Sequence, residues 1–367
     1  MRAAVTDGVG SMAVLDRAEP TAPGEGEVVI CPEAIGICGS DYHFFTGELS
    51  AAAGGSQFPR IQGHELAGTI TAAGPGCRAE LGIGRRVAVW PLHPCGRCYP
   101  CGAGRPNACD RLTLTGIHLD GGLQERLAIS QRQVFPITVD DPAIGAMTEP
   151  VSIAVRAVNR AAVQPGERAV VLGAGPIGQC IGLVARERDA ETLVIDLQES
   201  RLALARTLGA QTYPWRSADE VIEFARRWAG PAGPPVVFEA TGAAAATAAM
   251  LVMIASAGRA VQVGMSNEEA PVRVGVLTEK ELDLFGVSCC GEQEFADAVA
   301  VTERNGALVR RLISHEFGLD EAPEAMRFAI SNPARVMKVV VRCLSGAREG
   351  APTGRYSETT ASSRNPE

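Results

Sequence analysis

A glycine-rich loop between two apolar segments constrains the fold of this chain more than any other feature. The run Ala169–Leu172 is expected to be a buried parallel strand, and the residues after the loop predict a helix that continues to about Arg188. The loop has the pattern G-x-G-x-x-G, whose glycines allow a tight turn and the close approach of a pyrophosphate. The helix N-terminus adds unpaired N–H groups and the positive end of a dipole. The loop residues expected to contact a dinucleotide are Gly173, Gly175, Pro176, Ile177 and Gly178.

Strands and helices alternate along the chain after this loop. The expected strands are 192–195, 236–239 and 259–263, and the expected helices are 199–208, 218–229 and 243–255. This alternation predicts a doubly wound parallel sheet, an α/β architecture in which ligands bind at the carboxyl ends of the strands. Thr241, Val263 and Gly264 follow two of these strands, so we expect them to border the cofactor.

One carboxylate predicts which dinucleotide is bound. Asp196 ends the strand after the loop, 18 residues beyond Gly178. A carboxylate there accepts hydrogen bonds from both ribose hydroxyls and repels a 2′-phosphate, which favours NAD over NADP. The alternative is that Asp196 only caps the helix that follows. Arg201 is a possible contact for a 2′-phosphate, but with Asp196 present we expect it beside the adenosine ribose.

The first part of the chain, to about Met147, has a different pattern. Short apolar strands separated by Gly and Pro predict an antiparallel, barrel-like β-domain, and the apolar run Val336–Val341 is expected to return to it. We therefore expect a β catalytic domain of residues 1–155 and 293–344, and a dinucleotide-binding domain of residues 156–292. The stretch 345–367 is rich in Ser, Thr, Gly and Pro and is expected to be a disordered tail.

Four cysteines within a short segment predict a structural zinc site. Cys95, Cys98, Cys101 and Cys109 have the spacing C-x2-C-x2-C-x7-C, inside an expected lobe of about residues 91–111. Four thiolates surround one zinc ion tetrahedrally and leave no open position, which is typical of structural rather than catalytic zinc. Iron is the alternative metal for the same four ligands.

A second set of possible metal ligands is spread over the first half of the chain. Cys38, His64, Glu65 and Glu149 offer a thiolate, an imidazole and two carboxylates, all of which bind zinc. Ser40 and His43 follow Cys38 closely. A hydroxyl near an alcohol substrate and a more exposed imidazole suit a proton relay, although Ser40 is also a suitable helix cap.

The composition limits the classes of partner that this chain is expected to bind. The net charge is −8, and no compact run of Lys and Arg is present, so we expect no nucleic-acid partner. No apolar stretch reaches the roughly 18 residues of a membrane span, and the first residues lack the apolar core of a signal peptide. We expect a cytoplasmic protein, in which eleven cysteines indicate metal binding rather than disulfides.

Taken in order, these motifs resemble the zinc-dependent medium-chain dehydrogenases of the alcohol dehydrogenase superfamily, from about residue 3 to 341. The resemblance implies a GroES-like β-barrel catalytic domain, a Rossmann coenzyme domain, one catalytic and one structural zinc ion, and a homodimer or homotetramer. It implies that Cys38, His64 and either Glu65 or Glu149 hold the catalytic zinc, and that Ser40 and His43 relay the proton.

The finer likeness is to the sorbitol, threonine and sugar-acid 5-dehydrogenase branch. Glu149-Pro150-Val151-Ser152 resembles this branch, in which a Glu replaces the third-ligand Cys of the classical alcohol dehydrogenases. The segments 58–65 and 116–122 are similar to the L-idonate, L-gulonate and L-galactonate dehydrogenases in particular. A polyol or a sugar acid is the implied substrate. Arg60 is a candidate contact for a substrate carboxylate, and the favoured alternative is a solvated side chain that packs on its own loop. A simple alcohol, threonine or a cyclitol remains an alternative substrate, and a non-catalytic NAD(H) sensor is a remote alternative. A small-residue insertion at 50–56 departs from the family near the expected substrate entrance.

Overall fold

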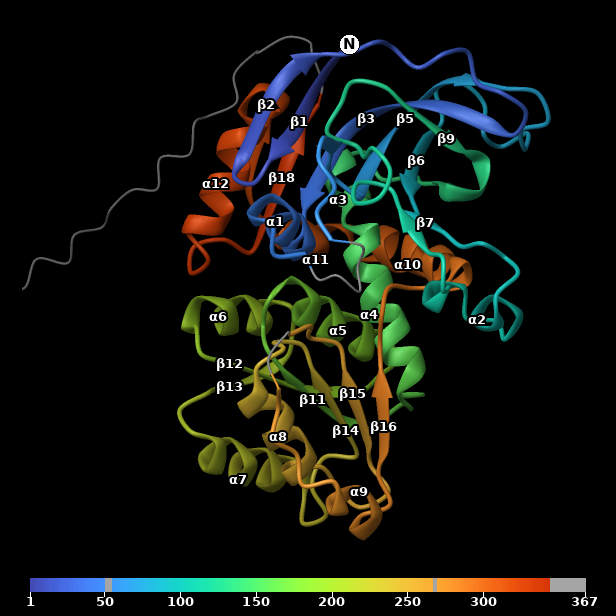
Figure 1. Ribbon diagram of the computed structural model, residues 1–367. Coiled ribbons are helices and arrows are strands. Elements are labelled where there is room, and N and C mark those ends of the chain that lie inside the picture. Colours follow the sequence, from blue (N-terminus) through green and yellow to red (C-terminus); the bar gives the residue numbers. More distant parts are fainter. Residues whose placement is uncertain (50–54, 267–268, 344–367) are drawn as a thin grey trace, which may run out of the picture.

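The computed structural model describes residues 1–49, 55–266 and 269–343. The chain forms two halves, one above the other in Figure 1, with both the first and the last strands in the upper half. Most of the predicted insertion, residues 50–54, and all of the predicted tail lie outside the described residues. Within the described ranges, no helix is both long and apolar enough to span a bilayer.

The lower half is built on a six-stranded sheet in which every neighbouring pair of strands is parallel, in the order β13-β12-β11-β14-β15-β16. This confirms the predicted doubly wound sheet. Its strands are β11 (Arg168–Leu172), β12 (Glu191–Asp196), β13 (Gln211–Pro214), β14 (Val236–Glu239), β15 (Arg259–Gln262) and β16 (Asp283–Gly286). Its helices are α5 (Pro176–Glu187), α6 (Glu199–Thr207), α7 (Ala218–Ala229), α8 (Ala244–Met253) and α9 (Gly275–Glu279).

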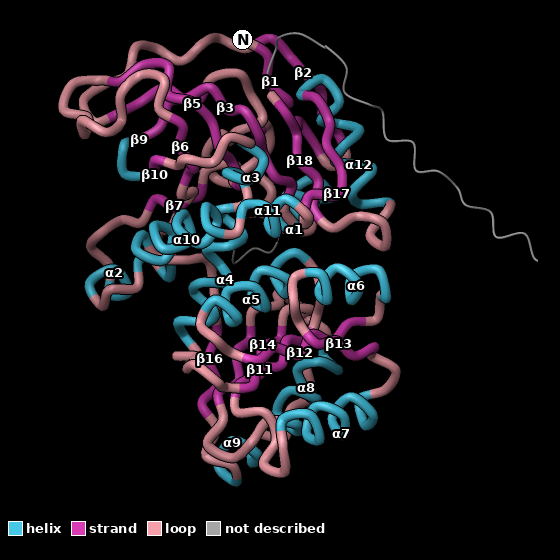
Figure 2. Tube along the Cα trace, turned by 180° about the vertical axis from the view of Figure 1, so that it is seen from behind, coloured by secondary structure: helices cyan, strands magenta, loops and turns pink. Residues whose placement is uncertain are grey.

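Both faces of this sheet are covered, which explains the continuous apolar runs of its central strands. Ala169 and Val171 pack toward α5 and α6, whereas Val170 and Leu172 pack toward α7 and α8. Figures 1 and 2 show α5 and α6 on the side of the sheet that faces the upper half. The sequence did not predict β13 and β16, because both are short edge strands with few apolar residues.

The upper half is mostly antiparallel. Its main sheet has the order β10-β6-β5-β3-β18-β17, and β9 also pairs with β3. The last strand pairs antiparallel with β3, as the apolar run near the end of the sequence predicted. Its strands are β1 (Arg2–Gly8), β2 (Ser11–Asp16), β3 (Glu27–Ile37), β4 (Arg60–Ile61), β5 (Glu65–Ala73), β6 (Arg86–Val89), β7 (Leu92–His93), β8 (Thr113–Leu114), β9 (Leu127–Ser130), β10 (Val134–Pro136), β17 (Ile313–Gly318) and β18 (Lys338–Arg342).

Helix α4 (Thr148–Arg160) joins the two halves, because it packs against α5 of the lower half and β5 of the upper half. The helices outside the parallel sheet are α1 (Gly39–Thr46), α2 (Tyr99–Gly102), α3 (Pro142–Ala146), α4 (Thr148–Arg160), α10 (Glu292–Arg304), α11 (Gly306–Arg310) and α12 (Ala322–Ser331). One buried apolar cluster extends from Trp90 in the upper half through α4 to Val171 in the lower sheet. The Trp90 indole N–H also donates to the carbonyl of Cys290, at 3.2 Å. The segment after β16 is therefore fixed to the upper half.

Candidate active site and metal centres

The glycine-rich loop lies where the sequence predicted it, between β11 and α5. Gly175 is the N-cap of α5, and Pro176 takes the first helical position, where its missing N–H costs nothing. A Cβ on Gly178 would lie 1.8 Å from the carbonyl oxygen of Gly173, so only glycine fits. The loop residues Gly173, Gly175, Pro176, Ile177 and Gly178 thus lie together at the carboxyl end of a central strand, with a helix N-terminus open to an anion.

Asp196 contacts this loop directly. One carboxylate oxygen accepts a hydrogen bond from the N–H of Ala174 at 2.7 Å, and the other accepts from the N–H of Gln198 at 2.8 Å. The side chain therefore lies at the end of β12, next to the loop. Arg201 also lies beside the loop, because its Nη1 is 4.0 Å from where a Cβ on Gly175 would be. Its Nη2 donates to the carbonyl of Pro333 at 2.9 Å, across the boundary between the two halves.

The three cofactor candidates on later strands also meet the loop. Thr241 follows β14, and its methyl group lies 2.6 Å from where a Cβ on Gly173 would be. Val263 and Gly264 follow β15, and both backbone N–H groups donate to the carbonyl of Glu239. The structure therefore brings the predicted residues of β11, β14 and β15 to one edge of the sheet.

Three of the four predicted catalytic ligands form a compact cluster in the upper half. The possible ligand atoms of Cys38, His64 and Glu65 all lie within 4.8 Å of one another. Cys38 is the N-cap of α1 at the end of β3, and β5 begins at Glu65, which pairs with Gly36 of β3. Two neighbouring strands therefore position all three side chains.

Glu149 lies near this cluster, on α4. Its carboxylate oxygens are not within 4.8 Å of the ligand atoms of all three residues. It lies buried in the first turn of the helix. Burial raises the pKa of Glu149 to about 7, with nearby Glu65 adding to the rise while His64 and Lys338 oppose it. A buried carboxyl of this kind favours its ionised form only when a cation is close.

A buried ion pair holds Glu65, and the sequence did not reveal its partner. The ammonium of Lys338 lies 2.7 and 2.8 Å from the two carboxylate oxygens of Glu65 and also donates to the carbonyl of Ile37. The side chains are 4% and 1% exposed. The signal that could have revealed this pair is a lysine, one of only two in the chain, within the otherwise apolar run Val336–Val341.

Asp41 is a second residue that the sequence reading did not assign. Its carboxylate accepts from the N–H of Cys38 at 2.9 Å and lies 3.6 Å from Nδ1 of His64. Burial lowers the pKa of His64, but Asp41 and Cys38 together raise it well above its ordinary value. A carboxylate on one ring nitrogen fixes the tautomer and directs the other nitrogen to a metal.

The two predicted relay residues lie on α1, one helical turn apart. The hydroxyl of Ser40 is 3.4 Å from Nε2 of His64. His43 is exposed, and its Nδ1 lies 3.6 Å from a carboxylate oxygen of Glu48. Ser40 thus borders the cluster, whereas His43 lies at the surface. Arg60 is ion-paired within the chain, because its guanidinium lies 3.2 Å from Asp120.

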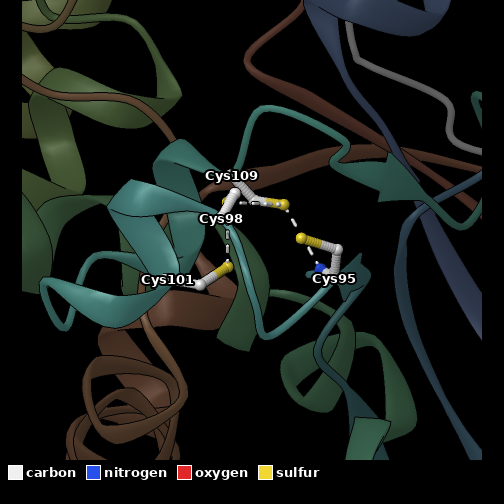
Figure 3. Close-up of side chains that lie close together, drawn as sticks. All are labelled: Cys95, Cys98, Cys101 and Cys109. Atoms are coloured by element: carbon white, nitrogen blue, oxygen red, sulfur yellow. Dashed lines mark hydrogen bonds between the residues drawn. The ribbon is translucent and has the colours of Figure 1, made fainter.

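The other cluster contains the four cysteines, shown in Figure 3. Their sulfur atoms also lie within 4.8 Å of one another, with α2 carrying one of them. The backbone N–H groups of Cys95 and Arg111 donate to Sγ of Cys109. A hydrogen bond from the backbone of Arg97 lowers the pKa of Cys95 to about 6, which favours the thiolate that a metal binds.

Both clusters fit zinc by donor type. Four converging sulfurs match a closed tetrahedral site. The thiolate, imidazole and carboxylate of Cys38, His64 and Glu65, with Glu149 nearby, match a site with an open position. The carboxylate of Asp41 lies 3.6 Å from Nδ1 of His64, on the side of the ring where an outer carboxylate orients such a ligand.

Comparison with known proteins agrees with this geometry. Residues 24–139 match the alcohol dehydrogenase GroES-like domain, and residues 176–304 match the zinc-binding dehydrogenase family. The chain is 31% identical to 2-dehydro-3-deoxy-L-galactonate 5-dehydrogenase of Pseudoalteromonas atlantica, over 88% of this chain and 93% of that protein. It is 30% identical to L-galactonate-5-dehydrogenase of Escherichia coli, over 87% and 92%.

Solved structures give the same result for the whole fold. An Escherichia coli protein described as a short chain alcohol dehydrogenase, solved with NADH, superimposes with a TM-score of 0.84 at 28% identity, covering 94% of this chain and 99% of that one. The predicted family and its two-part fold are thereby confirmed. The chain belongs to the zinc-binding alcohol dehydrogenases, the zinc-dependent medium-chain dehydrogenase family.

Proposed function

We propose that this enzyme uses NAD⁺ to interconvert a secondary alcohol of a polyhydroxy compound, a polyol or a sugar acid, with its ketone. The observation that carries the proposal is the cluster of Cys38, His64 and Glu65, with Glu149 beside it, in a chain that also has the dinucleotide loop. The names of the two galactonate-type relatives support a sugar acid or a related polyol as the substrate.

The proposed cofactor site is the edge of the parallel sheet. The N–H groups at the start of α5 would bind the pyrophosphate, because helix N-termini favour anions. Asp196 would accept bonds from the adenosine ribose, and its charge would disfavour a 2′-phosphate. Thr241, Val263 and Gly264 would border the nicotinamide half. Arg201 would contact the ribose or the adjoining phosphate from α6.

The proposed zinc ligands in the upper half are Cys38, His64 and one of the carboxylates Glu65 and Glu149. Zinc bound there supplies Lewis-acid polarisation of the substrate hydroxyl. The carboxylate of Asp41 lies 3.6 Å from Nδ1 of His64, and the Lys338 ion pair restrains Glu65. Cys95, Cys98, Cys101 and Cys109 would hold the second, structural ion.

The chain's own part in the reaction is to orient the substrate and move one proton. Bound NAD⁺ would supply the acceptor for the hydride of the substrate carbon, and the hydroxyl proton would leave as the ketone forms. Ser40 is close enough to the cluster to accept that proton, and His43 on the next turn of α1 would pass it to solvent. The overall change is alcohol plus NAD⁺ to ketone plus NADH plus one proton.

We also propose two domains, a catalytic domain of residues 1–155 with 293–344 and a dinucleotide-binding domain of residues 156–292. We further propose that the chain assembles as a homodimer or homotetramer. Among the described residues β16 pairs only with β15, and this edge supports association, because Leu284 and Val274 beside it are 48% and 69% exposed. A hollow of ≈ 590 Å³ that includes Val272, Leu277 and Leu284 adjoins this edge. Light scattering of the wild type and of Leu284→Glu tests the assembly; a monomeric wild type would contradict it.

The experiment on function is a spectrophotometric assay of NAD⁺ and NADP⁺ reduction by zinc-loaded enzyme. The substrates are hexonic acids, polyols, cyclitols, threonine and simple alcohols. Turnover with NAD⁺ and a hexonic acid or polyol supports the proposal. Turnover only with threonine, a cyclitol or a simple alcohol would replace the substrate class. Tight NADH binding with no turnover on any substrate would favour the sensor alternative.

A further inference from the structure

A fully buried carboxylate lies under the proposed cofactor site. Glu239 is the last residue of β14 and is 0% exposed. One carboxylate oxygen accepts from the N–H of Thr241 at 2.7 Å and from the hydroxyl of the same residue. The other accepts from the N–H of Gly242 at 3.0 Å and from the side-chain amide of Gln262 at 2.6 Å. All four donors are neutral groups.

This arrangement requires a carboxylate. A buried charge is stable only when hydrogen bonds replace water, and hydrogen bonds to a charged acceptor are the strong ones. Both oxygens of Glu239 act only as acceptors. An amide in its place would turn an N–H toward donors that are already present. The residue therefore has a role that glutamine cannot fill, although the two have nearly the same shape.

The bonds of Glu239 fix three turns against one another. Thr241 packs on Gly173, where a Cβ would lie 2.6 Å from its methyl group. Gly264 is so close that a Cβ on it would lie 2.1 Å from the nitrogen of Gly242 and 2.6 Å from the carboxylate of Glu239. Gln262 also donates to the carbonyl of Gly264 at 2.9 Å. Moving the carboxylate would thus move the surface formed by the turns after β14 and β15.

The strand order assigns this surface to one half of the cofactor. From β11 the chain goes to β12 and β13 on one side, then returns to β14, β15 and β16 on the other. In a doubly wound fold each side binds one mononucleotide, with the crevice where the order reverses. Asp196 ends β12 on the adenosine side, whereas Glu239 ends β14 on the opposite side.

We propose that Glu239 is a positioning residue for the nicotinamide half of the cofactor, acting through the Thr241–Gly242 turn and Gly264. The inference rests on the proposed NAD site. We therefore expect that loss of the Glu239 carboxylate weakens binding of the whole dinucleotide but not of the adenosine half alone.

The test compares two ligands on the full-length, zinc-loaded protein. NADH binding is followed by its fluorescence, and AMP binding by calorimetry. For Glu239→Gln we expect the Kd for NADH to rise about 10- to 100-fold, as for a buried group left unsatisfied. The Kd for AMP should stay within about twofold, and the zinc content should equal that of the wild type.

Two further variants separate positioning from general destabilisation. Val237→Ala shortens another fully buried side chain of β14 and should lower the melting temperature without changing the ratio of NADH to AMP affinity. The exchange Glu239→Gln with Gln262→Glu returns an acceptor to the pair, so we expect it to recover part of the NADH affinity. If Glu239→Gln fails to fold, Thr241→Val removes the hydroxyl that donates to Glu239 and accepts from the N–H of Ala243, and should show the same selectivity to a smaller degree.

The outcomes are distinct. Equal losses of NADH and AMP affinity in Glu239→Gln, or the same change of ratio in Val237→Ala, would overturn the positioning role while leaving the NAD site in place. A wild-type protein that binds neither ligand would overturn the proposed function and this inference with it.

Discussion

Lys338 and Glu65 form an ion pair that lies buried directly beside the Cys38–His64 cluster, with nitrogen–oxygen distances of 2.7 and 2.8 Å. The pair joins the last strand of the chain to β5 across β3. It also restrains one of the two carboxylates that compete for the proposed zinc. Glu149 forms no such ion pair among the described residues.

Replacement of Lys338 should therefore lower the free energy of unfolding. Lys338→Met leaves a buried carboxylate without its cation, and such a change costs about 3–5 kcal/mol of the free energy of unfolding. Urea unfolding followed by circular dichroism measures this loss. Lys338→Met combined with Glu65→Gln removes both charges and should recover a large part of it. A loss below about 1 kcal/mol in the single variant would show that the pair does not hold Glu65 as described.

The two cysteine sites should respond differently to substitution. Cys38→Ala should lose one zinc ion per chain and all turnover, yet keep NADH binding, since the dinucleotide loop is in the other half. Cys101→Ser should lose the other ion and lower the melting temperature, because a structural zinc stabilises the segment that surrounds it. Metal content by plasma mass spectrometry checks both. Unchanged zinc in either variant would contradict the assignment of that site.

The preference for NAD should depend on the charge of Asp196. Asp196→Asn keeps the size of the side chain and an oxygen that can accept from Ala174, but removes the repulsion of a 2′-phosphate. We expect the ratio of kcat/KM for NADP⁺ over NAD⁺ to rise at least about tenfold, equivalent to about 1.4 kcal/mol. Asp196→Ala also removes the bond to the loop and should weaken both cofactors. An unchanged ratio in Asp196→Asn would count against the role of the charge.

A pH effect on stability is expected at Asp141, which caps α3 and lies 2.8 Å from Arg342 and 3.2 Å from Arg310. Burial would raise its pKa, but hydrogen bonds from Arg342 and Ala143 lower it below the ordinary value of 3.8. The folded state then binds this proton less readily than the unfolded state. Stability from Asp141 is full above about pH 4 and is lost as the pH falls through the lowered pKa.

Asp141→Asn tests this effect. The variant should be less stable by about 0.5–1 kcal/mol at pH 7, because the carboxylate is partly exposed and caps a short helix. Urea unfolding of both proteins at pH 7 and at pH 3 should show the difference shrinking at the lower pH. A difference that stays constant between the two pH values would contradict the linkage.

The sequence predicted most of what has a local signature. The loop of Gly173, the central strands and the cysteine spacing follow from short-range patterns, and the structure has them at the expected residues. What the sequence missed depends on contacts between distant segments. Lys338 meets Glu65 from 273 residues away, and Glu239 gains its role only when Gln262 and the Thr241 turn surround it. Edge strands such as β16 have too few apolar residues to be predicted from the sequence.

The most direct measurement is NADH formation at 340 nm, as in the proposed assay, with zinc-loaded wild type and Cys38→Ala assayed side by side on a hexonic acid and a polyol. The predicted result is turnover with NAD⁺ by the wild type on at least one of them, and none by the variant, which still binds NADH. Equal turnover by the two proteins would contradict a zinc-dependent reaction at the Cys38–His64 cluster.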